Sequence, residues 1–433
     1  MKTKKFLQVA LDFVDLGRAV KVAREAIEGG ADWLEAGTPL IKSEGLNAVR
    51  TLKKLFPKKT IVADLKTFDA GRAEVEMAAK AGADIVSVMA AAPIETIRDS
   101  VLAGRNYGCR IMVDFLGIAD VESRARQLAE TGVNFFNVHL GIDQQMQGKA
   151  SFEIIKKLTR ATAIPIAASG GINSETAPLA LKAGATIVIV GGAIIKSPDA
   201  VSATRMIKKA MTKQKSIPTT LYRRAGTAAE ISKILKSVSA ANISDAMHRT
   251  FGLSGIVPVT QWPKMKMVGE AFTVRTCPGD WAKPVEAIDL AQPGQVIVIN
   301  AGGVPPAVWG DLATNSSVLR KLGGVVIDGA IRDVSEIRKL QFPAYSRQIC
   351  PQAGEPKGFG EINVPVYVGG CKVFPGDWVI GDEDGVMIIP KEKAIEFANR
   401  AMDVLEKENR LRAEIRKDGT LAQITELLRW EKV

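Results

Sequence analysis

Residues 60–71, TIVADLKTFDAG, run from apolar residues into three ionisable ones, Asp64, Lys66 and Asp69. The apolar half is typical of a strand that is buried on both faces, as parallel strands are. Because side chains alternate along a strand, Asp64 and Lys66 are expected on one face, with Asp69 just beyond the strand end. Charges held together there indicate either a site of chemistry or a structural ion-pair network.

The same pattern, an apolar run followed by a helix-like segment, occurs eight times within residues 1–212. Helix-like segments such as VEMAAKAGAD (75–84) contain a glycine just before the next run, a common helix stop. Eight such units predict an α/β fold, a (β/α)8 TIM barrel, more naturally than a doubly wound open sheet. The eight runs are FLQVALDF (6–13), ADWLEAG (31–37), TIVADLK (60–66), ADIVSVMA (83–90), CRIMVDFL (109–116), NFFNVHLG (134–141), IPIAASGGI (164–172) and TIVIVGGAI (186–194).

The carboxyl ends of the strands form the catalytic face of such a barrel. Ionisable residues end the first, second, third and sixth runs: Asp12, Glu35, Asp64 with Lys66, and His139. The last two runs end instead in small residues, namely Ser169, Gly170 and Gly171, and then Gly191 and Gly192. Backbone N–H groups of paired glycines can approach an anion closely, helped by the start of the following helix. This combination predicts a phosphorylated substrate.

The ionisable residues at these strand ends suit metal-assisted chemistry on a phosphosugar. Glu35 and Asp64 end neighbouring strands, and two carboxylates suit Mg²⁺ or another divalent cation that completes its shell with substrate and water. A lysine beside them, Lys66, would stay protonated and stabilise an oxyanion. His139 is one of only two histidines. We expect it to transfer protons, although a hydrogen-bonded structural histidine is the alternative.

The spacing Asp64-x-Lys66-x-x-Asp69 is the D-x-K-x-x-D signature of the orotidine 5'-monophosphate decarboxylase suprafamily. The strings LQVALD, WLEAGTPLIKSEG, TIVADLKTFDAG, VHLGIDQQ and ASGGI resemble 3-hexulose-6-phosphate synthases across essentially all of 1–212. The resemblance implies a reversible aldol reaction of ribulose 5-phosphate with formaldehyde, through a Mg²⁺-stabilised enediolate. It implies metal binding by Glu35 and Asp64, enediolate stabilisation by Lys66 and proton transfer by His139.

The resemblance also gives Asp12 a supporting role in the site, and it places Asp69 in the site of a partner subunit. The alternative within the suprafamily is 3-keto-L-gulonate-6-phosphate decarboxylase, which shares the metal site and the enediolate. That branch tends to have an arginine where this sequence has Ile142. This difference favours the synthase.

The chain is longer than one hydrophobic core usually supports, at 433 residues. Residues 213–224, KQKSIPTTLYRR, break the barrel pattern with polar residues and a proline, which predicts a linker. Residues 225–433 mix helices with many short strands, which predicts a mixed α/β domain. The charged C-terminal helix, 391–416, is expected to pack on that domain with a solvated face.

The second half contains WGDLATNSSVLRKLGGVVIDGAIRDVSEI (309–337), in which Asp311 precedes an Arg332–Asp333 pair and Glu336 follows by about one helical turn. Arg332 suits a planar carboxylate or enolate, and Asp333 suits a divalent cation. The glycine- and proline-rich loop at 302–310 could hold a carboxylate or phosphate. Surface ion pairing is the alternative.

These motifs, with GDWVIGDEDGVMIIP (376–390), resemble the regulator of ribonuclease activity A and class II 4-hydroxy-4-methyl-2-oxoglutarate aldolases over about 225–415. The resemblance implies a swivelling β/β/α fold and a 2-oxo acid substrate. Arg332 would polarise the substrate carbonyl, Asp333 would bind Mg²⁺ directly, and Asp311 would act through metal-bound water. Glu336, which the regulator branch tends to lack, favours a lyase over a non-catalytic module that binds a ribonuclease or another protein.

The bulk composition is that of an ordinary globular protein, with 46% hydrophobic and 24% charged residues. The net charge of +11 comes from basic residues scattered through helical segments, which argues against nucleic-acid binding. The sequence contains no apolar stretch long enough for a membrane span, and four widely spaced cysteines favour a cytoplasmic setting.

The two resemblances imply a homo-oligomer of dimeric barrels and trimeric second domains, and a hexamer would satisfy both.

Overall fold

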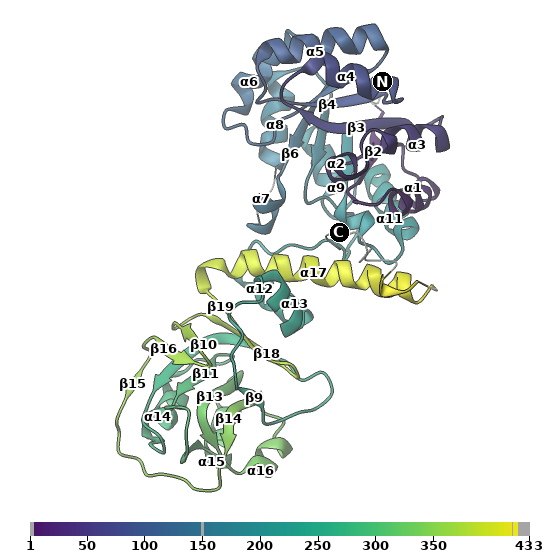
Figure 1. Ribbon diagram of the computed structural model, residues 1–433. Helices are drawn as coiled ribbons and strands as arrows, with labels where there is room; N and C mark the ends of the chain where they lie inside the picture. The colour runs from purple at the N-terminus through teal and green to yellow at the C-terminus, as the bar shows by residue number, and fades with distance from the viewer. Residues whose placement is uncertain (1–3, 149–150, 418, 423–433) are drawn as a thin grey trace, which may run out of the picture. The chain divides into compact units, whose positions relative to one another are not determined.

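The computed structural model describes residues 4–148, 151–417 and 419–422 (Figure 1). The chain divides into two compact units. The first unit takes its described residues from Met1–Gln145, Lys149–Arg223 and Glu406–Val433, and the second consists of Met146–Gly148 and Arg224–Leu405. None of the helices in these described ranges combines the length and apolar character that crossing a membrane requires.

The first unit contains eight parallel strands that close into a barrel, as the sequence predicts. Each strand pairs with the next, and the last closes on the first through pairs such as Phe6 with Ile187. The strands are β1 (Phe6–Leu11), β2 (Trp33–Ala36), β3 (Thr60–Thr67), β4 (Ile85–Met89), β5 (Arg110–Asp114), β6 (Phe135–His139), β7 (Ile166–Ser169) and β8 (Ile187–Val190).

Helices alternate with these strands and begin and end at residues suited to those positions. Asp15, for example, caps the first helix by accepting a hydrogen bond from the Arg18 N–H at 2.6 Å. The helices are α1 (Leu16–Glu28), α2 (Thr38–Glu44), α3 (Asn47–Leu55), α4 (Gly71–Lys80), α5 (Ile94–Tyr107), α6 (Val121–Ala129), α7 (Ile142–Met146), α8 (Phe152–Ala161), α9 (Ala177–Ala183), α10 (Gly192–Ile195) and α11 (Ala200–Lys213).

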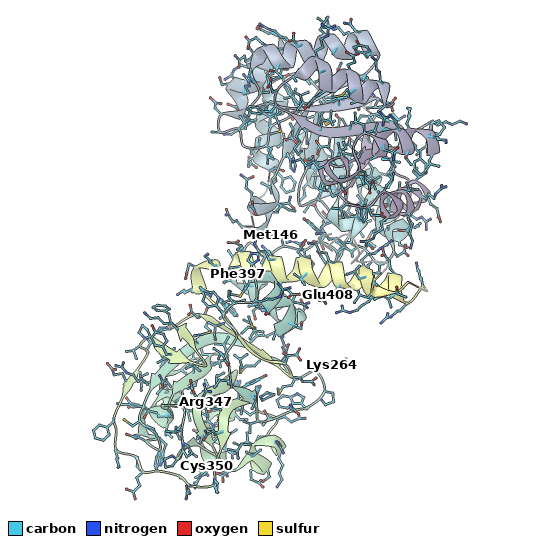
Figure 2. All side chains as sticks on the ribbon, in the orientation of Figure 1. Met146, Lys264, Arg347, Cys350, Phe397 and Glu408 are labelled. Carbon is cyan, nitrogen blue, oxygen red and sulfur yellow. The ribbon has the colours of Figure 1, made fainter. Side chains whose placement is uncertain are left out.

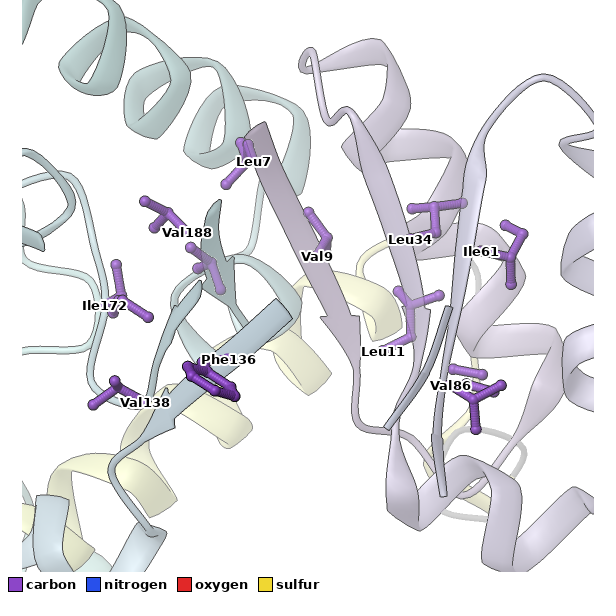
Figure 3. Close-up of a cluster of buried hydrophobic side chains, with 14 of the residues drawn as sticks. Leu7, Val9, Leu11, Leu34, Ile61, Val86, Phe136, Val138, Ile172 and Val188 are labelled. Carbon is purple, nitrogen blue, oxygen red and sulfur yellow. The ribbon is translucent and has the colours of Figure 1, made fainter. Parts of the chain in front are cut away.

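The barrel strands are apolar on both faces, which explains their continuous runs in the sequence. Side chains such as Leu7, Leu34, Ile61 and Val188 form the core between strands and helices (Figure 3). The alternate positions point inward and fill the barrel with a second apolar cluster. That cluster consists of Ala10, Trp33, Val62, Ile85, Met112, Phe135, Ala167, Ile187 and Ile189.

Strand β3 departs from the regular alternation that the sequence analysis assumes. Its pairing with β4 shifts register between Ala63 and Thr67. Lys66 has a φ of 51° within this irregular stretch, a left-handed conformation that is uncommon for a non-glycine residue. The Lys66 side chain nevertheless contacts Asp64, as the sequence predicts.

The segment predicted as a linker is packed against the barrel up to Arg223. Ile217 exchanges hydrogen bonds with Ser174, through its N–H at 3.1 Å and its carbonyl at 2.8 Å. The Asn173 side chain donates to the carbonyl of Leu221 at 3.1 Å. The boundary of the first unit therefore falls inside the predicted linker, because its polar backbone groups are satisfied by the loop after β7.

The second unit contains a mixed sheet, in agreement with the predicted mixed α/β domain. Its strand order is β19-β18-β10-β11-β13-β14-β9, with β12 paired to β13 and β15 to β10, and β16 and β17 form a separate pair. The strands are β9 (Val257–Pro258), β10 (Met267–Arg275), β11 (Val296–Asn300), β12 (Ala307–Trp309), β13 (Gly324–Ile331), β14 (Ala344–Ile349), β15 (Glu361–Ile362), β16 (Val366–Val368), β17 (Cys371–Val373), β18 (Trp378–Asp382) and β19 (Gly385–Ile389). The helices are α12 (Ala228–Ser237), α13 (Ala240–Ala246), α14 (Ala282–Leu290), α15 (Asp311–Leu319), α16 (Val334–Lys339) and α17 (Ala394–Ile415).

The C-terminal helix α17 contributes residues to both units, whereas the sequence analysis assigns it to the second domain alone. Its early residues Ala394, Ala398 and Ala401 are buried in an apolar cluster of the second unit. Its residues from Glu406 on belong to the first unit. There the buried Arg410 donates to the Ser197 carbonyl at 2.9 Å, a contact that ties this part of the helix to the barrel.

Candidate active site

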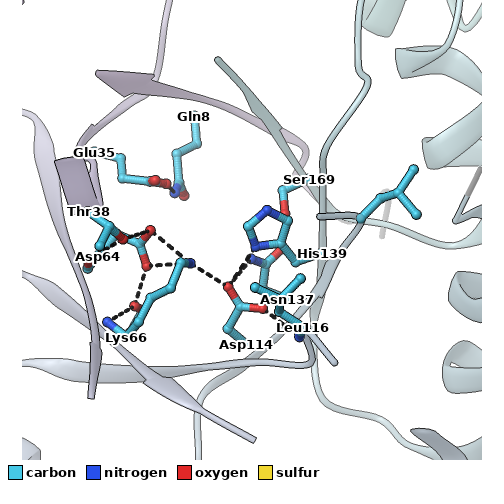
Figure 4. A network of polar contacts seen from close by, with 12 residues as sticks. Gln8, Glu35, Thr38, Asp64, Lys66, Asp114, Leu116, Asn137, His139 and Ser169 are labelled. Carbon is cyan, nitrogen blue, oxygen red and sulfur yellow. Dashed lines mark hydrogen bonds and ion pairs between the residues drawn. The ribbon is translucent and has the colours of Figure 1, made fainter. Parts of the chain in front are cut away.

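Polar residues gather at the carboxyl ends of the barrel strands (Figure 4), next along the strands to the apolar cluster that fills the barrel. Each follows an inward apolar residue by two positions, as a pleated strand requires. These residues are Asp12, Glu35, Asp64, Ser87, Asp114, Asn137 and Ser169. Lys66 and His139 reach the same space through their contacts with these residues. The barrel thus brings the predicted metal ligands Glu35 and Asp64 together with the predicted catalytic residues Lys66 and His139.

Glu35 is a buried carboxylate in a crowded acidic environment. Only 7% of the residue is exposed, and it accepts a hydrogen bond from the Gln8 side chain. Burial and the neighbouring charges of Asp64 and Asp12 raise the pKa of Glu35 well above its ordinary value. Glu35 therefore holds a proton readily unless a positive charge arrives beside it.

Asp64 is held by three donors around its carboxylate. The Thr38 hydroxyl donates to Oδ2 at 2.8 Å, and the Ser87 hydroxyl donates to Oδ1 at 2.5 Å. The Lys66 ammonium lies 3.0 Å from Oδ2. These contacts fix the orientation of the carboxylate at the barrel mouth through side chains from α2, from β4 and from β3 itself.

Lys66 is placed between two carboxylates. Its Nζ lies 3.0 Å from Asp64 Oδ2 and 2.8 Å from Asp114 Oδ2. Burial disfavours the charge, but Asp64 and Asp114 outweigh it and raise the pKa of Lys66 above its ordinary value. Lys66 therefore remains an ammonium group at neutral pH, suited to stabilising negative charge and unsuited to accepting a proton.

Asp114, at the end of β5, is a residue of the site that the sequence analysis missed. It is fully buried and accepts from Lys66 and from the backbone N–H of Leu116, and His139 Nδ1 lies 2.9 Å from its Oδ2. Burial works to raise its pKa, but the hydrogen bond and charge of His139, together with Lys66, lower the pKa below its ordinary value. Its place at the end of the fifth apolar run is the signal that could have identified it.

Asp12 follows β1 and lies against the glycines of two loops. A Cβ on Gly37 would lie 2.2 Å from Asp12 Oδ1, and a Cβ on Gly191 would lie 3.1 Å from its Oδ2. Glycine at these positions thus leaves room for the carboxylate. Desolvation at the barrel mouth and the Asp64 charge raise the pKa of Asp12, while Lys66, His139 and Lys196 act in the opposite direction.

The carboxylates at the mouth offer oxygen atoms of the kind that bind divalent cations. Asp12, Glu35 and Asp64 interact electrostatically, and all three offer hard oxygen ligands. The Oε1 atom of Gln8 is buried with no hydrogen-bond partner among the described residues. No group of three or more His, Cys, Asp or Glu side chains in the described ranges is arranged as a metal site. A cation here would therefore need substrate or water to complete its shell.

The two glycine-bearing loops lie at the ends of β7 and β8. The Ser169 hydroxyl donates to Asn137 at 3.0 Å, and Gly170 and Gly171 have φ values of 88° and 72°. The helix α9 begins only at Ala177, and α10 after Gly191 spans four residues. The expected contribution of helix starts is therefore small, and the backbone N–H groups of the loops are the available anion donors.

Asp69 lies outside the cluster around Lys66. It is exposed beyond the end of β3, and its carboxylate accepts a hydrogen bond from the N–H of Ala70 at 2.7 Å. The structure thus keeps Asp69 away from the other signature residues of its own chain. Its role in a partner subunit stays a prediction.

The second unit brings together some of its predicted site residues. Arg332 Nε lies 3.4 Å from Asp333 Oδ2, and the backbone N–H of Asp311 donates to the same oxygen at 3.3 Å. A Cβ on Gly310 would lie 2.5 Å from this oxygen, so glycine makes room for the carboxylate. The Glu336 side chain instead pairs with Lys339 at 2.7 Å on the surface. The prediction that Glu336 binds a metal together with Asp333 gains no support from these contacts.

A further pair in the second unit was not identified from the sequence. Arg347, labelled in Figure 2, is a residue of β14. Its Nε lies 2.5 Å from Asp328 Oδ1, and the other oxygen of Asp328 accepts from the N–H of Gly369 at 2.8 Å. Gly303, in the glycine- and proline-rich loop, lies against both side chains of the pair. The loop is therefore supported by an ion pair from β13 and β14.

A closed (β/α)8 barrel with acidic, lysine and histidine side chains at its strand ends defines the class of TIM-barrel enzymes. Residues 5–207 match the family model described as Orotidine 5'-phosphate decarboxylase / HUMPS family. Over 206 residues the chain is 38% identical to 3-hexulose-6-phosphate synthase of Bacillus subtilis, covering 47% of this chain and 97% of that protein. The chain belongs to this family, and the predictions of an enzyme and of this resemblance are confirmed.

Two other similarities concern the same half of the chain, and one concerns the second half. The 3-hexulose-6-phosphate synthase of Mycobacterium gastri is 35% identical over 205 residues, covering 47% of this chain and 99% of that protein. A crystal structure of the Salmonella typhimurium synthase aligns with 32% identity and a TM-score of 0.47, over 48% of this chain and 99% of that one. Residues 240–388 match the RraA-like family model, described as Aldolase/RraA, so the second unit contains an RraA-like domain.

Proposed function

We propose that the barrel is a 3-hexulose-6-phosphate synthase, a carbon–carbon lyase that joins ribulose 5-phosphate and formaldehyde reversibly. The observation that carries the proposal is Lys66, held as an ammonium between Asp64 and Asp114 beside the Glu35 carboxyl. A positive charge fixed at the barrel mouth is suited to an enediolate, whose oxygens carry negative charge. The names of the relatives supply the substrate, and the geometry supplies the chemistry.

In this mechanism the protein binds the phosphate and stabilises charge at the opposite end of the sugar. The N–H groups of Gly170, Gly171, Gly191 and Gly192 would hold the phosphate. Loss of a proton from C1 of ribulose 5-phosphate gives the enediolate, whose C1 attacks the formaldehyde carbon. The new alkoxide then takes up a proton. Lys66 faces the developing charge throughout, and in reverse the same carbon–carbon bond breaks.

His139 is the candidate for moving protons in these steps. Its Nδ1 lies 2.9 Å from Asp114 Oδ2, so the carboxylate favours the tautomer with the proton on Nδ1. Nε2 is then the nitrogen that can accept and return a proton. Mg²⁺ bound by Glu35 and Asp64 would supply further positive charge for the enediolate oxygens.

The alternative is a 3-keto-L-gulonate-6-phosphate decarboxylase, which would use the same cluster. Ile142, at the start of α7, is exposed where that branch tends to have an arginine. An apolar residue there favours the synthase, since it cannot pair with a substrate carboxylate.

An activity assay tests the assignment. The purified protein with Mg²⁺ should consume ribulose 5-phosphate only when formaldehyde is present, and Asp64→Ala should abolish this consumption. Decarboxylation of the keto-gulonate phosphate without synthase turnover would contradict the assignment.

For the RraA-like domain we propose a divalent-metal-dependent lyase or decarboxylase acting on a 2-oxo acid. Support comes from Arg332 and the Asp311 backbone, which meet at the Asp333 carboxylate. The full chain should release pyruvate from a 4-hydroxy-2-oxo acid with Mg²⁺, and Asp333→Ala should remove that activity alone. If the wild-type chain does not turn over such acids, the domain is instead a non-catalytic module that binds a ribonuclease or another protein.

The assembly and location of the protein follow from the same family relationships and stay proposals. Dimeric barrels and trimeric RraA-like domains would be compatible in a hexamer, in which Asp69 would serve a partner barrel. A cytoplasmic location fits both proposed activities. Light scattering of the purified chain would measure the assembly directly.

A further inference from the structure

Tyr222 lies in the segment after the last barrel helix, and it contacts the loops expected to bind phosphate. It is 7% exposed and belongs to the main apolar cluster of the barrel. A Cβ added to Gly192 would lie 2.2 Å from the ring atom Cε2, so the ring packs directly on the β8 loop. The Tyr222 hydroxyl donates to Gln145 Oε1 at 2.9 Å.

Gln145 connects Tyr222 with the second loop. It is buried, and its Nε2 donates to the Leu140 carbonyl at 2.7 Å. A Cβ on Gly170 would lie 2.9 Å from that Nε2, and the nearest atoms to a Cβ on Gly171 all belong to Gln145. Tyr222 therefore supports the β8 loop by its ring and the β7 loop through Gln145.

Lys196 brings a positive charge to the same place. Its Nζ lies 5.4 Å from the centroid of the Tyr222 ring, within the range of a cation–π contact. It follows directly after α10, the short helix that starts at Gly192. Its charge also acts on Asp12, whose carboxylate lies against Gly191. The ammonium group is thus beside the loop of Gly191 and Gly192.

Two backbone hydrogen bonds within the first unit fix the position of Tyr222. Its N–H donates to Glu406 Oε1 at 2.6 Å, and its carbonyl accepts from Asn173 at 3.5 Å. Glu406 belongs to the last part of α17, which the first unit includes. Both contacts lie within the first unit, so Tyr222 is part of the barrel's own structure.

We propose that Lys196 is the cationic side chain of the phosphate subsite. Tyr222 is the positioning residue that holds Lys196 beside the loop after β8 and Gln145 against the loop after β7. The inference rests on the proposed function, since it takes the ligand to be a phosphate monoester. An ammonium beside several backbone N–H donors matches the charge and the acceptor oxygens of such a group. Segments beyond residue 212 therefore contribute to substrate affinity in the barrel.

Steady-state kinetics on the full-length chain test this assignment. Lys196→Gln should raise the KM for ribulose 5-phosphate by about tenfold or more, as expected for losing a hydrogen bond to a charged group. Tyr222→Phe keeps the ring and loses only the hydroxyl, so about a threefold rise is expected. The kcat and the KM for formaldehyde should stay within about twofold, and inhibition by inorganic phosphate should weaken in parallel with the KM.

Lys80 and Tyr107 provide a matched control pair. Lys80 Nζ lies 5.3 Å from the Tyr107 ring, and Tyr107 ends α5 just before β5, at the opposite end of the barrel. Lys80→Gln and Tyr107→Phe should leave all four kinetic quantities unchanged. Thermal unfolding of each variant separates a local effect from a loss of folded protein.

Two results would overturn the inference. One is an unchanged KM and unchanged phosphate inhibition in Lys196→Gln. The other is a lower KM in Tyr222→Phe or Tyr222→Leu, which would mean that the tyrosine obstructs the subsite. If the wild-type chain shows no synthase turnover, the proposed function fails and calorimetry with inorganic phosphate decides the inference. Binding about tenfold weaker in Lys196→Gln supports it, and equal binding refutes it.

Discussion

Lys66 and His139 depend on the same carboxylate oxygen, since their nitrogens lie 2.8 and 2.9 Å from Oδ2 of Asp114. Water does not screen this carboxylate, because Asp114 is fully buried. Removing its charge would therefore disturb two groups together. Lys66 would lose one of the two charges that raise its pKa, and His139 would lose the acceptor that selects its tautomer.

Replacing Asp114 by asparagine should lower kcat by about 100-fold or more, the range expected for losing a positioned proton-transfer group. The side chain keeps its size, but an amide carries no charge to hold Lys66. The matched control is Asp84→Asn, since Asp84 pairs with Lys53 at 2.8 Å near the start of β4, at the other end of the barrel. A kcat within about twofold of wild type in Asp114→Asn would refute this role.

The raised pKa of Glu35 predicts how pH and metal act on stability. The folded state holds the proton more tightly than the unfolded state, whose glutamate has a pKa near 4.5. Without divalent cations, Glu35 should therefore lower the free energy of unfolding as pH rises from there through the folded pKa. A bound cation needs the ionised carboxylate, so Mg²⁺ should raise the Tm more at pH 8 than at pH 5.

Melting curves at both pH values, with and without Mg²⁺, measure this coupling. Glu35→Gln is the control, because it removes the titrating group and keeps the shape. The difference in Tm between wild type and Glu35→Gln isolates the contribution of Glu35 from those of Asp12 and Asp114, which also titrate. A Mg²⁺ effect independent of pH and equal in both proteins would argue against a cation at Glu35.

At the scale of elements, regular periodicity made the barrel predictable, and irregular contacts did not follow from it. The eight apolar runs and their polar ends place Glu35, Asp64 and His139 correctly, because strand ends meet at one face of a barrel. The register shift in β3 and the left-handed conformation of Lys66 could not be read from alternation. Asp114 was missed although it stands at the end of the fifth apolar run, the same kind of position as that of Glu35.

The loop after β7 shows why glycine is required at an element's end. Gly170 has a φ of 88°, and a Cβ there would lie 2.1 Å from the Leu140 carbonyl oxygen. Gly170→Ala should therefore lower the free energy of unfolding by about 1–3 kcal/mol or more. It should also raise the KM for the phosphosugar. Denaturant unfolding and steady-state kinetics measure the two effects.

Gly171→Ala separates strain from collision in this test. Its φ is 72°, but the nearest atom to its added Cβ is 3.8 Å away in the Gln145 side chain. This variant should bear the backbone strain without the clash, so its loss of stability should be smaller. Equal losses in the two variants would mean that the close approach to Leu140 contributes nothing.

At the scale of the whole molecule, the boundaries of the units do not follow the two stretches of sequence that resemble different families. The first unit takes in residues up to Arg223 and again from Glu406, although the family match of the barrel ends at residue 207. A sequence pattern shows that α17 is a charged helix, but not which unit contains each of its turns. That assignment depends on contacts between residues hundreds of positions apart, such as Arg410 with Glu25.

Arg410 offers a direct test of this interpretation. It is 4% exposed, lies 3.3 Å from Glu25 Oε2 and 2.7 Å from Glu414 Oε1, and donates to the Ser197 carbonyl at 2.9 Å. Arg410→Ala would leave these acceptors without their charged donor, so the first unit should lose about 1–3 kcal/mol of stability. Hydrogen exchange in α1 and in residues 191–197 reports on this unit specifically, and exchange there should become faster.

Arg412, on the same helix, provides the control. Its side chain is 51% exposed and paired with Glu408, so Arg412→Ala should change exchange little. If both variants exchange like wild type, the end of α17 does not stabilise the barrel, and the barrel's stability is set by residues before Arg223 alone.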